Sequence, residues 1–209
     1  MTDLMSNSTT NIKKKALGLS YFTVAYNIIE GLVSIAAGLI AGSTALVGFA
    51  LDSFVESLSA TVMVWRFRKH ETRSEEEEER IEEWAEKLVG YTFLILGVYV
   101  LYEAGKSIYL HEAAEPSLLG IAIAVLSVII MPLLYGSKMR VGKAINSRSL
   151  IADAKETLAC VFLSIALLLG LVTNYLFSIW WTDPAAGVII AGFLLKEGYE
   201  TLTEEEDDD

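Results

Sequence analysis

The sequence has 209 residues, of which 53% are hydrophobic, and a formal net charge of −11 at pH 7. Its apolar residues form runs long enough to cross a bilayer, which excludes an ordinary soluble globular domain. The lysines and arginines form no patch typical of nucleic-acid binding, so nucleic acid is excluded as a partner. The sequence therefore predicts an integral, multi-pass membrane protein embedded in a lipid bilayer.

Six apolar segments follow one another along the chain, each near the roughly 20 residues that a membrane helix requires. They lie at residues 16–40, 43–67, 87–110, 116–136, 148–173 and 178–199. We therefore expect an all-α membrane protein with six transmembrane helices. Its predicted parts are an N-terminal segment (1–15), the membrane domain (16–199) and an acidic tail (200–209).

The first segment carries an acid at mid-depth, Glu30, with Asn27 about one turn before it. An ionisable residue inside a membrane helix is a functional candidate by default. Glu30 is an ion ligand, a proton carrier or the partner of a buried lysine, and the sequence leaves these roles open. We treat both residues as candidates for an accessory or proton-coupling role.

The second segment holds two acids, in the sequence LVGFALDSFVES (46–57). Asp52 and Glu56 are four residues apart, so they share one helix face about 6 Å apart along its axis. They lie near the bilayer midplane, where a carboxylate costs about 2.5–3.5 kcal/mol. An interhelical hydrogen bond or ion pair is the structural alternative, but two such acids favour an ion-binding site.

Lysine and arginine residues gather on one side of the membrane. They lie before the first segment, in the loop 68–86 and around the short connection GSKMRVGK (136–143), whereas the opposite connections hold almost none. Because cytoplasmic loops carry an excess of these residues, both termini are predicted to be cytoplasmic. The acidic loop 68–86 is expected to be a solvated helical extension on the same side.

The fifth segment repeats the arrangement of the second, because Glu156 and Cys160 are also four residues apart. A shift of 104 residues overlays Asp52 on Glu156 and Glu56 on Cys160, a faint internal repeat of the kind that transporters show. Since the two segments run in opposite directions, the pairs can face each other at one depth. Four ligands suit a tetrahedral transition-metal site, although simple packing is the alternative role of Cys160.

Three further acids lie outside these pairs. Asp153 precedes Glu156 by three residues on the cytoplasmic side, and it is either an access-path carboxylate or a charge near the helix cap. Asp183 and Glu197 lie near opposite ends of the sixth segment. We expect both to be structural or interfacial.

The sequences STALVGFALDSFVES (43–57) and SRSLIADAKETLAC (147–160) resemble the second- and fifth-helix signatures of the cation diffusion facilitators. Members of that family export zinc and related divalent ions against protons. The resemblance covers nearly all of residues 16–199 and implies a homodimer, which we expect in the cell (inner) membrane. The metal ligands that it implies are Asp52, Glu56, Glu156 and Cys160.

Two features depart from the pattern of this family. The four ligand positions hold no histidine, and the usual C-terminal cytoplasmic domain is absent from the sequence, which indicates a membrane-only member. A thiolate favours zinc or cadmium, whereas three carboxylates favour harder ions such as manganese or iron, with cobalt as a further candidate. Zinc is the expected substrate on the resemblance alone.

Three carboxylates and a thiol crowded in a low-dielectric site cannot all be ionised, so the empty site is expected to hold protons. A divalent ion displaces them, because its ligands must be deprotonated. The sequence thus predicts a metal/proton antiporter that works by alternating access and is not an enzyme. The alternatives are a non-transporting membrane metal-binding or accessory protein, and a carrier of a non-metal substrate whose acids relay protons.

Overall fold

The computed structural model describes residues 2–69, 75–112 and 114–203. Over these residues the chain forms six helices and no strand. The helices are α1 (Thr2–Ala41), α2 (Thr44–Lys69), α3 (Glu75–Leu110), α4 (Leu118–Ile145), α5 (Arg148–Phe177) and α6 (Thr182–Thr203). Residues 70–74 and 204–209, which belong to the predicted acidic loop and tail, lie outside the described residues.

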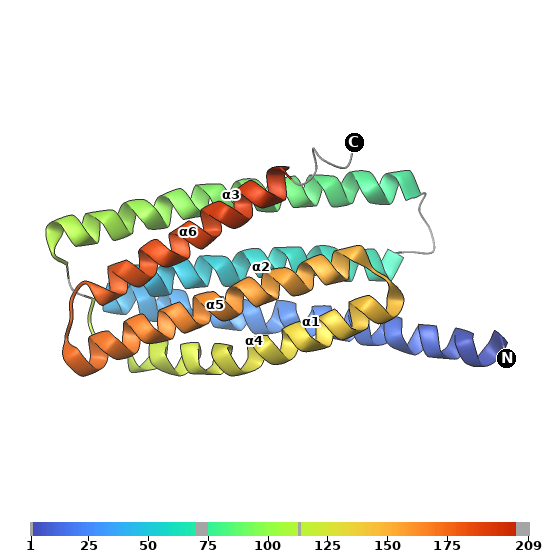
Figure 1. Ribbon diagram of the computed structural model, residues 1–209, viewed down its shortest axis with the longest axis horizontal. Coiled ribbons are helices and arrows are strands. Elements are labelled where there is room, and N and C mark those ends of the chain that lie inside the picture. Colours follow the sequence, from blue (N-terminus) through green and yellow to red (C-terminus); the bar gives the residue numbers. More distant parts are fainter. Residues whose placement is uncertain (1, 70–74, 113, 204–209) are drawn as a thin grey trace.

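Five helices contain a segment that is long and apolar enough to cross a membrane. These segments are Lys14–Ala41, Thr44–Trp65, Gly90–Leu110, Leu118–Ile145 and Asp153–Phe177. The remaining helix, α6, runs alongside them from the left of Figure 1 and stops near the middle of the view, whereas α1 begins at the far right. The prediction of an all-α membrane protein with six helices is therefore confirmed.

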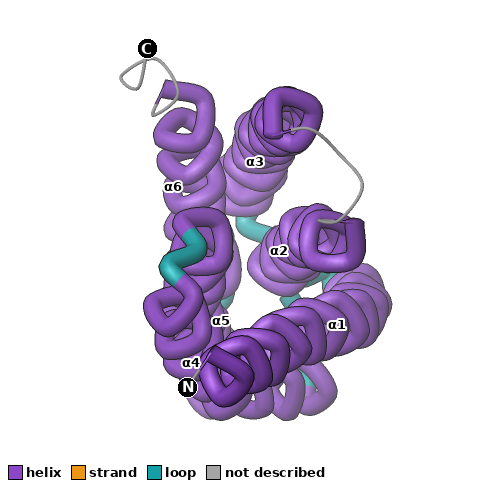
Figure 2. Tube along the Cα trace, turned by 90° about the vertical axis from the view of Figure 1, so that its right-hand side faces the viewer, coloured by secondary structure: helices purple, strands orange, loops and turns teal. Residues whose placement is uncertain are grey.

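The helices are stacked in layers, with α3 beside α6, α2 beside α5 and α1 beside α4 (Figures 1 and 2). Between the layers, α1 packs on α2, and α2 and α5 also contact α6. The middle layer of α2 and α5 is thus covered by other helices on both sides. Polar side chains on these two helices can therefore be shielded from lipid.

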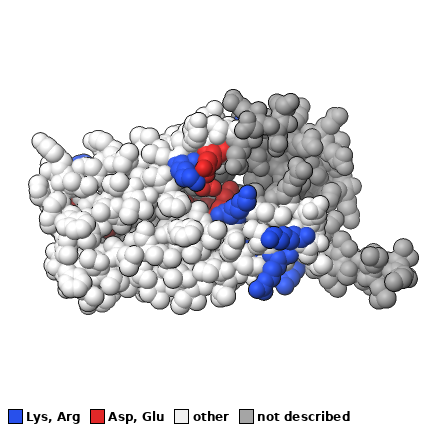
Figure 3. All heavy atoms as spheres, viewed as in Figure 1, with Lys and Arg blue, Asp and Glu red and all other residues white. Residues whose placement is uncertain are grey.

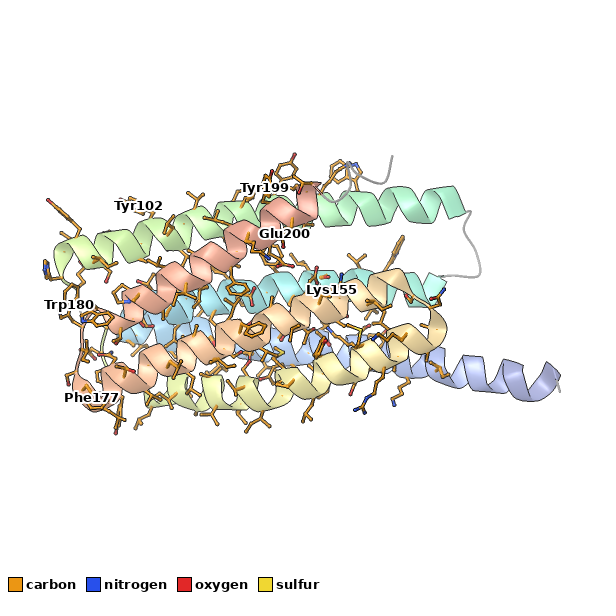
Figure 4. All side chains as sticks on the ribbon, in the orientation of Figure 1. Tyr102, Lys155, Phe177, Trp180, Tyr199 and Glu200 are labelled. Atoms are coloured by element: carbon orange, nitrogen blue, oxygen red, sulfur yellow. The ribbon has the colours of Figure 1, made fainter. Side chains whose placement is uncertain are left out.

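The distribution of side chains is that of a membrane protein, with apolar groups outside and polar groups inside. Tyr102 of α3 and Phe177 at the end of α5 point away from the bundle (Figure 4) and are largely exposed. Buried hydroxyls such as Ser20 and Ser164 instead donate to the carbonyl one turn earlier, which satisfies them without water. On the face in Figure 3, the half toward the α5–α6 connection is almost free of charge. The chain is an integral, multi-pass membrane protein.

An acid of α6 caps the first turn of α2. The carboxylate of Asp183 accepts the backbone N–H of Thr44 at 2.9 Å and also the hydroxyl of Ser43. Ser43 in turn accepts the N–H of Leu46. The first N–H groups of a helix have no partner within it, so this buried carboxylate ties α6 to the start of α2. Asp183 is structural, as the sequence led us to expect.

The α1 and α4 helices extend well beyond their predicted ends. The α1 helix begins at Thr2, because no glycine or proline interrupts the chain before Gly18. The predicted connection 136–143 is instead the last part of α4, which ends only where Asn146 adopts a left-handed conformation with φ of 52°. Glycine inside a helix costs only about 1 kcal/mol, so the glycines at 136 and 142 do not stop it. Pro132 also lies within this helix.

Candidate metal centre

The four candidate ligands line one pocket, which lies between α2, α3, α5 and α6. Side chains nearly fill it, and the cavity volume that remains is about 10 Å³, which is about enough for one water molecule. Asp52, Glu56 and Cys160 are buried and Glu156 is half-buried. Apolar residues of the neighbouring helices and one further acid complete the lining: Phe93, Ala159, Leu163, Phe193, Leu194 and Glu197. The predicted pairing of the second and fifth helices is thus present.

Contacts across the α2–α5 interface connect the two pairs directly. The thiol of Cys160 donates to Oδ2 of Asp52 at 3.0 Å. One turn further along α2, the hydroxyl of Thr157 donates to Oε1 of Glu56 at 2.6 Å. The residue number thus rises along α2, from 52 to 56, while that of the partner on α5 falls, from 160 to 157. This is the pattern expected for antiparallel helices. This geometry brings the acid of one helix within reach of the thiol of the other.

Glu156 is held slightly apart from the other candidates. Its Oε2 accepts the hydroxyl of Ser59 at 2.6 Å, at a level of α2 beyond Glu56. The neighbouring Lys155 is exposed on the outside of α5 (Figure 4), so it does not compete for this carboxylate. Glu156 therefore contacts α2 through the hydroxyl group of Ser59.

Within the described part of the chain, no three His, Cys, Asp or Glu side chains converge closely enough to hold a metal ion. In the contacts described above, hydroxyl groups hold one carboxylate oxygen of Glu56 and one of Glu156. Among the side-chain oxygens of these four candidates that the structure describes, Oε2 of Glu56 is the one that is both buried and without a hydrogen-bond partner. Coordination by all four residues thus needs side-chain rotation within the pocket.

Lys138 of α4 is the polar residue at this site that the sequence did not indicate. It is fully buried, and its Nζ lies 3.0 Å from Oδ2 of Asp153 and 3.5 Å from Oε1 of Glu56. It also donates to the hydroxyl of Thr157 at 2.8 Å. A buried charge requires pairing of this kind. Asp153 is therefore an ion-pair partner inside the bundle.

A signal for the burial of Lys138 is present in the sequence. Met131, Leu134 and Val141 are buried on α4, and Lys138 continues their spacing of three and four residues. Such spacing defines one face of a helix. Extending the helical pattern past Gly136 would have placed the lysine on the interior face.

Glu30 and Asn27 lie outside the pocket. Both carboxylate oxygens of Glu30 are occupied, one by the hydroxyl of Tyr26 at 2.8 Å and the other by Ser53 of α2 at 3.0 Å. The suggestion that Glu30 pairs with a buried lysine is wrong, because the buried lysine contacts Glu56 and Asp153. Asn27 is fully buried, and its side-chain amide has no hydrogen-bond partner.

Acidic side chains are also visible from outside the bundle. In Figure 3 they lie in a hollow near the middle of the molecule, with basic side chains on either side. Toward the α5–α6 connection, the same face shows almost no charged side chain. Glu197, which the sequence suggested was structural or interfacial, lines the pocket from α6.

Comparison with known proteins gives several relatives, two of which have metals in their names. Transmembrane protein 163 of Xenopus laevis is 25% identical over 96% of this chain and 71% of its own length. The manganese efflux system protein MneS of Bacillus subtilis is 22% identical over 92% of this chain and 67% of its own. The cadmium, cobalt and zinc/H(+)-K(+) antiporter of Bacillus velezensis is 28% identical over 89% of this chain and 59% of its own.

The chain thus spans between 59% and 71% of the length of these relatives. A family model agrees with them over most of the chain, because the cation efflux transmembrane domain matches residues 20–205. This match includes both ligand pairs and all of the pocket. The chain therefore belongs to the cation efflux family, the cation diffusion facilitators that its second and fifth helices resemble.

Proposed function

We propose that this chain transports divalent transition-metal ions out of the cytoplasm in exchange for protons, as a carrier rather than an enzyme. Its family and its relatives support metal cation transport. The observation that carries the finer proposal is the pocket lined by two acid-bearing pairs on the central helices. We also propose that the carrier works as a homodimer in the cell membrane.

The proposed ligands are Asp52 and Glu56 of α2 with Glu156 and Cys160 of α5. A carboxylate costs too much inside a membrane to be kept there without a role. The unpartnered Oε2 of Glu56 and the adjoining thiol of Cys160 offer one hard and one soft donor in the same pocket. Zinc, a borderline ion, suits this mixture, and cadmium, manganese, iron and cobalt are the other candidates.

Proton exchange follows from the contact between Cys160 and Asp52. The protonated thiol of Cys160 donates a hydrogen bond to the carboxylate of Asp52. A metal ion binds the thiolate, so the S–H bond must break and its proton must leave before the S–metal bond forms. Each binding event thus releases a proton, and each return of the empty carrier takes one up. Alternating access then couples metal export to proton entry.

The test is metal flux into proteoliposomes that contain the purified chain. Zinc, manganese, iron(II) and cadmium are supplied separately under an imposed pH gradient, and wild type is compared with Asp52→Asn. The matched control is Glu200→Gln, which removes the same charge from a side chain that is 44% exposed on α6. We expect proton-coupled flux in wild type and the control but not in Asp52→Asn.

The alternatives predict different results in the same assay. Metal binding without flux would indicate a membrane metal-binding or accessory protein. That outcome has structural support, because Glu56 is paired with a lysine instead of lying open to an ion. Proton movement that persists under strong chelation would indicate a carrier of a non-metal substrate.

A further inference from the structure

Lys138 is unusual among the basic residues of this protein. Of the lysines and arginines whose side chains the structure describes, it is the only buried one. Its ammonium group lies among α2, α4 and α5, and two carboxylates and one hydroxyl surround it. A positive charge inside the bundle, next to a cation-binding pocket, opposes the binding of a metal ion.

The two acid partners of Lys138 differ in position. Glu56 lines the pocket, whereas Asp153 does not. The lysine is 3.0 Å from Asp153 and 3.5 Å from Glu56, so it lies closer to the acid outside the pocket. Glu56 is therefore shared between the lysine and the pocket, and Asp153 pairs with the lysine independently of the pocket.

A metal ion on Glu56 would lie a few ångströms from the ammonium group. Two cations at this separation in a low-dielectric interior repel each other strongly. The repulsion is relieved when the ammonium group withdraws toward Asp153, with which it is already in contact. Pairing of Lys138 with Glu56 and binding of metal by Glu56 are thus in competition.

We propose that Lys138 is an internal counter-cation that bridges Glu56 and Asp153 while the pocket is empty and pairs with Asp153 alone when a metal ion binds. The lysine thereby weakens metal binding and promotes metal release. Asp153 is the acid that pairs with the ammonium group while the metal ion is bound. Lys138 and Asp153 are positioning residues that act through Glu56. This inference rests on the proposed function, because it concerns the affinity of the same pocket.

The test uses the full chain and measures the dissociation constant for zinc ions in detergent, and for manganese ions in parallel. Zinc flux in proteoliposomes gives the maximal rate and the concentration for half-maximal flux. Lys138→Met should bind zinc on the order of tenfold more tightly and turn over more slowly, because the repelling charge is gone. Asp153→Asn should bind zinc more weakly, because the lysine then has only Glu56 as an acidic partner.

Two controls separate this role from a structural one. Lys138→Arg keeps the charge and should keep the wild-type affinity, and Lys143→Met removes an exposed charge from the same helix and should change nothing. If Lys138→Met does not fold, the doubly neutral Lys138→Met/Asp153→Asn replaces it. It must then bind more tightly than Asp153→Asn, from which it differs only at the lysine.

The outcomes also distinguish this inference from the proposed function. If wild type binds and moves zinc or manganese, but Lys138→Met binds with equal or lower affinity, the counter-cation is refuted and the transporter stands. If wild type neither binds nor moves either ion, the proposed function fails, and the counter-cation fails with it. Opposite shifts in Lys138→Met and Asp153→Asn support the proposal, since a merely structural pair would give losses in both.

Discussion

Replacement of Gly198 by alanine tests the contact between α3 and α6, the helices that form one wall of the pocket. A Cβ atom at this position would lie 2.8 Å from the carbonyl oxygen of Gly90 and 3.0 Å from the backbone nitrogen of Leu94. Ordinary van der Waals contact begins at 3.4 Å. Because the clashing atoms belong to the backbone, no rotamer change relieves them, and the helices must move apart.

Such overpacking costs about 1–3 kcal/mol, and the better helix propensity of alanine returns roughly 1 kcal/mol. We therefore expect Gly198→Ala to lower the free energy of unfolding by about 0–2 kcal/mol in net terms. The neighbouring residues Phe93 and Glu197 line the pocket, so separation of the helices should also reduce zinc flux. Unfolding is measured in mixed micelles by titration with a denaturing detergent, followed by circular dichroism.

Two other glycines on the same helix pair provide controls. A Cβ at Gly192 meets no atom within 4 Å, so Gly192→Ala should keep the helix-propensity gain and raise the free energy of unfolding by roughly 1 kcal/mol. A Cβ at Gly90 meets Cγ of Leu202 at 2.8 Å, which is a flexible side chain, so Gly90→Ala should be milder than Gly198→Ala. If Gly198→Ala is as stable and as active as Gly192→Ala, the close backbone approach of α3 and α6 does not exist in the protein.

Three further predictions concern residues with assigned contacts. Asp183→Ala removes the cap of α2 and should lower the free energy of unfolding by about 1–2 kcal/mol in the same titration; unchanged stability would mean that water caps the helix equally well. Cys160→Ser replaces the soft donor, so competition flux should shift from cadmium and zinc toward manganese, and an unaltered ion preference would place the sulfur outside the coordination sphere. Glu30→Gln should leave zinc affinity unchanged, because both oxygens of Glu30 are held by hydroxyls outside the pocket; a loss of binding in equilibrium dialysis would make Glu30 a ligand after all.

The pairing of α2 with α5 was predictable because it depends on two periodic features. The four-residue spacing fixes the shared face of Asp52 and Glu56, and the antiparallel direction fixes which residues of α5 lie opposite. The contact between Asp52 and Cys160 follows from these rules without any knowledge of loop geometry. The number of helices was equally predictable, because the hydropathy of each segment can be judged without knowledge of the others.

The role of Lys138 was not predictable by the same means. A lysine near the end of a membrane helix is normally a cytoplasmic flanking charge, and the glycines around it suggested a loop. The spacing of buried residues could have placed this side chain on the interior face of α4, but tertiary packing decides that its partner is Asp153. The place of Glu197 in the pocket lining was also not foreseen. Its position near the end of α6 suggested a structural or interfacial role, and the sequence does not show which residues of the other helices lie beside it.

The cap of α2 by Asp183 also affects how the protein is made. Residues 44 and 183 are separated by most of the chain, so the N–H of Thr44 finds its carboxylate only after α6 has been synthesised and inserted. The same helix supplies Phe193, Leu194 and Glu197 to the pocket. A nascent chain that ends at α5 therefore lacks both the final cap and one wall of the pocket, so the ion-binding site is completed only when the last helix arrives.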